Sequence, residues 1–127
     1  MPDRQVTLDP AIVPDVRVVL EHAVCRVVEY LSDPDSGPRV AEMGGVLSRL
    51  LELGEALGAV GRHCWTTADV AVSPKMLPLI LEAARGDLDP TIAAFNPDDA
   101  EERDRVFAWS VVPLRVIEEL SRLVDAA

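Results

Sequence analysis

Apolar residues recur along this chain at intervals of three and four, the spacing that places them on one side of an α-helix. The clearest run lies within residues 14–31, where valines and leucines dominate the apolar positions. Valine favours strands by propensity, but the run does not alternate with a period of two. The pattern therefore predicts a helix over 14–31, and no segment of the chain predicts a strand.

A turn is predicted at 33–38, because its prolines and glycine cannot continue a helix. Ser36 is expected to cap a second helix that follows this turn. The inward side of that helix is predicted to carry Val40, Met43, Leu47, Leu50, Leu51 and Leu57.

The second helix also holds most of the glycines of the chain: Gly44, Gly45, Gly54, Gly58 and Gly61. Each costs about 1 kcal/mol relative to alanine inside a helix. Gly54, Gly58 and Gly61 share one face, so either another helix approaches this face closely or the helix ends near Gly58.

Two further helices are predicted in the second half of the chain. Ser73 and the proline after it form the start of a third helix, and Gly86 is expected to end it. The inward residues of this helix are predicted to be Leu77, Ile80, Leu81 and Ala84. A short helix over 91–95 is compatible with the sequence, whereas 62–73 shows no clear pattern.

The fourth helix is predicted to begin at Asn96, which precedes a proline and two aspartates. Pro113 should bend this helix, because proline lacks the N–H that the helical hydrogen bond needs. The inward stripe is predicted to be Val106, Ser110, Leu114, Ile117, Leu120 and Val124.

Together these elements predict an all-α fold. Short connections favour antiparallel neighbours, so we expect a four-helix up-and-down bundle over 10–127, preceded by a flexible N-terminus at 1–9. The alternative is an irregular orthogonal helical array, because prolines and glycines interrupt the regular pattern.

Composition limits the classes of function. The 127 residues are 49% hydrophobic, which disfavours intrinsic disorder. The net charge of −10 disfavours direct binding to nucleic acid through a basic face. The longest uncharged stretch, 106–114, is too short to span a membrane. Cys25 and Cys64 are expected to be reduced thiols in the cytoplasm.

Acidic residues concentrate in 87–104, which holds seven of them and one arginine: Asp87, Asp89, Asp98, Asp99, Glu101, Glu102, Asp104 and Arg103. Acids favour helix N-termini because of the helix dipole, which accounts for part of this cluster. The functional interpretation is that Asp98, Asp99, Glu101 and Glu102 bind a basic partner protein, or mimic the charge of nucleic acid.

The remaining chemistry is sparse. His22, Cys25, His63 and Cys64 lack the spacing of structural zinc sites, so no metal or other cofactor is predicted. No nucleophile elbow and no phosphate-binding loop is present, so no catalytic residue is predicted.

Two tryptophans, Trp65 and Trp109, lie near predicted breaks, where large rings line a cleft or an interface or simply fill the core. The sequence therefore predicts a non-catalytic, acidic helical interaction module, an adaptor or regulator that binds a partner protein or forms a homodimer. Its predicted binding residues are His63 and the two tryptophans together with the four acidic residues at 98–102. The alternative is a bundle that binds a small molecule or a metal in a pocket near His22, His63, Cys64, Trp65 and Trp109.

Overall fold

The computed structural model describes residues 5–61, 70–93, 96 and 98–126. The described elements are β1 (Val6–Leu8), α1 (Val13–Ser32), a 3₁₀ turn η1 (Val40–Glu42), α2 (Met43–Gly61), β2 (Val70–Val72), α3 (Met76–Ala93) and α4 (Ala100–Ala126). The predicted all-α class is therefore confirmed. Within the described part of the chain, no helix combines the length and the apolar character needed to cross a membrane.

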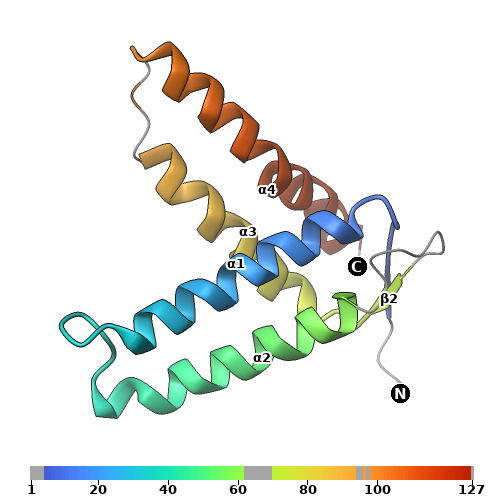
Figure 1. Cartoon of the computed structure of the whole chain (residues 1–127). Coiled ribbons are helices and arrows are strands. Elements are labelled where there is room, and N and C mark those ends of the chain that lie inside the picture. The colour runs from blue at the N-terminus through green and yellow to red at the C-terminus, as the bar shows by residue number, and fades with distance from the viewer. Residues whose placement is uncertain (1–4, 62–69, 94–95, 97, 127) are drawn as a thin grey trace.

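The helices form two antiparallel hairpins, α1–α2 and α3–α4 (Figure 1). α1 packs against each of the other three helices, and so does α3, although its contact with α2 is small. The hairpins cross where α1 meets α3, and their closed ends point in different directions (Figure 1). As a result, the end of α3 and the start of α4 protrude from the body of the molecule (Figure 1).

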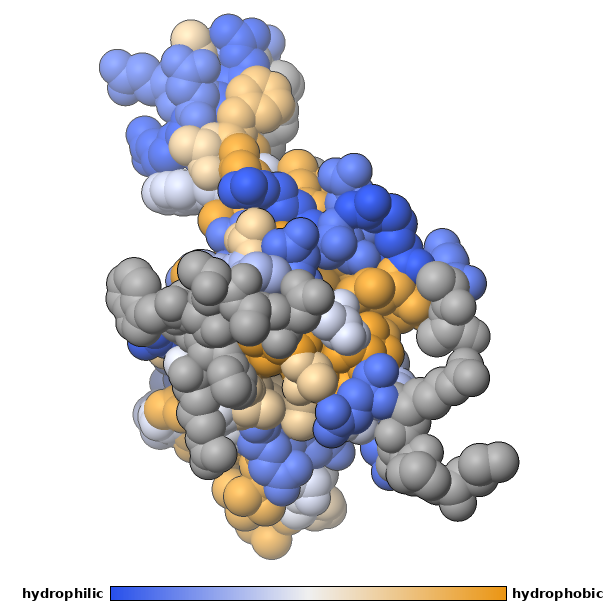
Figure 2. Space-filling model, turned by 90° about the vertical axis from the view of Figure 1, so that its right-hand side faces the viewer, coloured by the Kyte–Doolittle hydropathy of each residue, from blue (hydrophilic) through white to orange (hydrophobic). Residues whose placement is uncertain are grey.

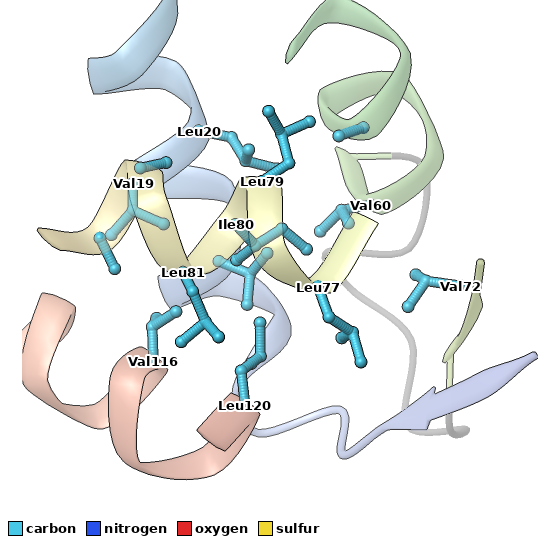
Figure 3. Packing of buried hydrophobic residues seen from close by; sticks show 14 of the residues in the cluster. Val19, Leu20, Val60, Val72, Leu77, Leu79, Ile80, Leu81, Val116 and Leu120 are labelled. Carbon is cyan, nitrogen blue, oxygen red and sulfur yellow. The ribbon is translucent and has the colours of Figure 1, made fainter. Parts of the chain in front are cut away.

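The core gathers apolar side chains from all four helices (Figure 3). Leu20 of α1, Ile80 of α3 and Leu120 of α4 are fully buried, and Val60 of α2 joins the same cluster. The helix predicted over 14–31 is confirmed as α1 at Val13–Ser32. Packing of its valine-rich side against three helices outweighs the strand propensity of valine.

The prediction that the chain has no strand is wrong. Val6–Leu8 pairs antiparallel with Val70–Val72, with Leu8 opposite Val70. Leu8 is fully buried in the same core. Strands of three residues are too short to show a period in the sequence.

The turn between α1 and α2 is built around the Asp33 side chain. Its carboxylate accepts hydrogen bonds from the backbone N–H groups of Asp35 (2.9 Å) and Ser36 (3.0 Å), and these bonds lower the pKa of Asp33. Gly37 is required here, because a Cβ at this position would overlap the carbonyl oxygen of Asp33. Ser36 lies inside the turn and does not cap the second helix, which corrects the sequence prediction.

The predicted inward side of α2 is wrong in part, although the predicted residue Leu57 does pack against the core. The structure buries Leu53, Ala56 and Val60 and leaves Leu47 and Leu51 exposed. Val40, in η1, is exposed as well. The leucines of this helix spread over nearly half of its circumference, so the period alone does not fix which part of that arc is buried.

Within the described part of the chain, no other helix packs closely on the glycines of α2. A Cβ added at any of them would meet nothing within 4 Å, so the close packing expected at Gly54, Gly58 and Gly61 is absent from the described structure. The helix also continues past Gly58 to Gly61.

α3 buries the predicted residues Leu77, Ile80, Leu81 and Ala84. It does not end at Gly86 but continues to Ala93, so 91–93 belongs to the same helix and not to a separate short one. Leu88, which follows Gly86, is buried, and this packing favours continuation of the helix.

α4 begins at Ala100, four residues after the predicted start at Asn96. Asp99 caps it, since its carboxylate accepts hydrogen bonds from the backbone N–H groups of Glu101 (3.0 Å) and Glu102 (3.2 Å). The helix continues through Pro113. Its buried residues are Ser110, Pro113, Val116 and Leu120. The predicted inward positions Leu114 and Val124 are exposed instead.

Candidate functional site

A pocket of about 430 Å³ lies where α1 meets the α3–α4 hairpin. α1 and α3 contribute its polar groups, and α4 contributes most of its apolar wall. The lining residues are Val18, His22, Asp87, Ala108, Trp109, Val112 and Pro113.

The polar side of the pocket is a histidine held by a carboxylate. His22 Nδ1 lies 2.8 Å from Asp87 Oδ2. A carboxylate can only accept hydrogen bonds, so Nδ1 carries the proton and Nε2 is the ring nitrogen that this contact does not use. The Asp87 side chain is 11% exposed, whereas the His22 side chain is mostly exposed.

Arg26 completes this polar cluster. Its guanidinium pairs with Asp87 Oδ1 and donates a second hydrogen bond to the Ala83 carbonyl oxygen at 3.1 Å. The charge of the Asp87 carboxylate is therefore matched by a cation from α1, and the cluster joins α1 to α3.

The guanidinium of Arg26 lies against α3 at Gly86. A Cβ at Gly86 would lie 2.7 Å from Arg26 Nη2. The absence of a side chain at this position lets Arg26 reach Asp87 and the Ala83 carbonyl, which gives Gly86 a structural role different from the helix end that the sequence predicted.

Two glycine-to-alanine substitutions test this role of Gly86. Gly54→Ala is expected to raise the free energy of unfolding by about 1 kcal/mol, because alanine favours the helix and its Cβ meets nothing. Gly86→Ala should raise the free energy of unfolding by less than Gly54→Ala does, or lower it, because the new Cβ displaces the Arg26 guanidinium. Urea unfolding of both variants measures the difference. Equal gains at the two positions would contradict the role of Gly86.

Trp109 supplies the largest ring of the pocket. It is 62% exposed. Further along α4, the residues on the same side of the helix, such as Leu120, are buried against the body of the molecule. Trp109 and His22, which the alternative interpretation of the sequence placed near one pocket, both line this one.

The four predicted acidic binding residues, Asp98, Asp99, Glu101 and Glu102, lie together at the start of α4. They do not line the pocket. Asp99 caps the helix, so part of this cluster has a local structural role. Asp87, which the sequence grouped with them, is paired with Arg26 and His22 instead.

His63, Cys64 and Trp65 lie outside the described residues. Cys25 is an exposed free thiol. Among the described residues, no group of three or more histidine, cysteine, aspartate or glutamate side chains is arranged to hold a metal ion.

A second surface lies on the outer face of α4 and was missed by the sequence prediction. Phe107, Val111 and Leu114 are exposed. Their spacing of four and three residues places them on one stripe, which we call the outer stripe. In Figure 2 the protruding end of the hairpin shows hydrophobic surface among hydrophilic groups. The spacing was visible in the sequence, but Leu114 was assigned to the core.

Comparisons of the chain with protein-family models, with curated proteins and with solved structures found no match.

Proposed function

We propose that this protein is a helical interaction module that pairs with a second copy of itself through the outer stripe of α4. The observation that carries the proposal is the exposure of three large apolar side chains in a row on a helix whose opposite side is buried. Phe107 is 64% exposed, and Val111 and Leu114 are about half exposed. Covering such a stripe removes apolar surface from water, which favours association.

The stripe is suited to an antiparallel pair. Phe107 and Leu114 lie at the two ends of the stripe, with Val111 between them. A two-fold axis near the middle of the stripe therefore places Phe107 of one copy against Leu114 of the other. The large ring then packs on an aliphatic side chain at both ends of the contact, and the two Val111 side chains meet near the axis.

The charges beside the stripe follow the same symmetry. Arg103 lies four residues before Phe107, and Glu118 lies four residues after Leu114. Both are exposed. The antiparallel arrangement that pairs Phe107 with Leu114 therefore also pairs Arg103 with Glu118, twice in the dimer. Opposite charges at the edges of a helix pair favour one orientation over others.

Sedimentation equilibrium tests this proposal on the full chain. Phe107→Glu is expected to weaken the dimer at least tenfold, which is about 1.4 kcal/mol, because it puts a charge on the apolar stripe. Leu51→Glu is the matched control, since Leu51 is also exposed and apolar but lies on α2. A monomeric wild-type chain at high concentration, or equal effects of the two substitutions, would refute the proposal.

Charge reversal tests the orientation. Arg103→Glu and Glu118→Arg should each weaken the dimer, and the double variant should recover part of the loss because it restores opposite charges. Arg105→Glu is the control, because residue 105 is exposed and lies away from the stripe. Additive losses in the double variant would exclude the antiparallel arrangement.

We also propose a cytoplasmic location for this module. An exposed free thiol such as that of Cys25 is typical of reducing compartments. Fluorescence imaging of the tagged chain in its host tests the location.

A further inference from the structure

We infer that the pocket between α1, α3 and α4 binds a small aromatic molecule that carries a hydroxyl group, with His22 Nε2 accepting the hydrogen bond from that hydroxyl. This binding site is independent of the proposed dimer contact. Trp109 is two residues from Phe107, about 200° around the helix, so the pocket and the outer stripe lie on different sides of α4.

The size of the pocket fits a small ligand. Its volume of about 430 Å³ falls in the range of pockets that bury small molecules, which are mostly apolar with a few placed polar groups. Val18 of α1 and Val112 and Pro113 of α4 line this space, and Pro113 is buried. The walls therefore favour an apolar body.

The Trp109 indole favours an aromatic body over an aliphatic one. Its ring lines the pocket yet remains 62% exposed. A planar ring placed in the pocket would cover part of this surface. Aromatic pairs in stacked or edge-to-face contact are worth about 1 kcal/mol beyond the apolar area that they bury.

His22 and Asp87 define the polar group of the ligand. The contact of 2.8 Å fixes the Nδ1 proton on the Asp87 side, so a neutral His22 presents Nε2 as an acceptor. Asp87 already pairs with Arg26, so its carboxylate charge is matched within the protein. The complementary ligand group is therefore a neutral donor. A phenolic hydroxyl meets this requirement on an aromatic ring.

Three probe molecules of similar size test the inference on the full chain by isothermal titration calorimetry. They are 4-methylphenol, toluene and 4-methylbenzoate. We expect 4-methylphenol to bind at least tenfold more tightly than either of the others. Equal binding of toluene would show that Nε2 takes no part. Tighter binding of 4-methylbenzoate would show that the site is cationic, and no binding of any probe would also overturn the inference.

Two variants locate the binding. His22→Leu should weaken the binding of 4-methylphenol at least tenfold and leave the binding of toluene unchanged, because the substitution removes the hydrogen-bond acceptor and keeps the apolar wall. Val112→Trp should abolish binding by filling the pocket, whereas Val124→Trp, on an exposed position of the same helix, should not. The His22 side chain is mostly exposed, so His22→Leu tests the site even if Val112→Trp does not fold. Unchanged binding of 4-methylphenol in His22→Leu would overturn the inference.

Discussion

Leu20→Ala is expected to lower the free energy of unfolding by about 3 kcal/mol, as truncation of a fully buried leucine does. Leu20 lies on α1, which packs against each of the other three helices, and its side chain has no exposed surface (Figure 3). The substitution removes the apolar contacts and leaves a cavity that the surrounding helices close only in part. Chemical denaturation followed by circular dichroism measures the change.

Leu51→Ala is the matched control for this prediction. It is the same substitution in a helix of the same protein, but Leu51 is 70% exposed. We expect a change of less than about 0.5 kcal/mol, as at most exposed positions. Similar losses for the two variants would mean that Leu20 does not lie at the centre of the core described above.

Asp87→Ala is expected to lower the free energy of unfolding by about 2 kcal/mol, the scale of hydrogen bonds that involve charged groups. The Asp87 carboxylate is largely buried and holds both the Arg26 guanidinium and the His22 ring. Its loss leaves Arg26 beside α3 without this anion. The cost stays below that of a fully buried ion pair, because Arg26 and His22 are exposed enough for water to hydrate them.

Asp89→Ala provides the comparison, since Asp89 is an exposed aspartate two residues further along the same helix. Its removal should change the free energy of unfolding by less than about 0.5 kcal/mol. Urea unfolding of the two variants at one salt concentration separates the effect of the cluster from the general effect of lowering the negative charge. An equal response would show that the contacts of Asp87 contribute nothing of their own.

The candidate pocket was predictable only in part. His22 and Trp109 stood out in the sequence as a rare titratable residue and a large ring. Asp87 was read as one more acid in a cluster, and Arg26 drew no attention. Asp87 lies 61 residues from Arg26 and 65 residues from His22 along the chain. No local pattern reveals a contact over such a separation.

The sequence by itself determined the elements whose cause is local: the helical class, the extent of α1, the turn built on Asp33 and the inward residues of α3. Period, prolines and side-chain caps act within a few residues, so they can be read from a short stretch. Only the tertiary structure decided which side of α2 and α4 is buried, that α3 continues past Gly86, and that β1 pairs with β2. These features depend on which surfaces meet, because burial against another helix or strand outweighs local preferences of about 1 kcal/mol per residue. The same packing brought His22, Arg26 and Asp87 together and left the outer stripe of α4 uncovered.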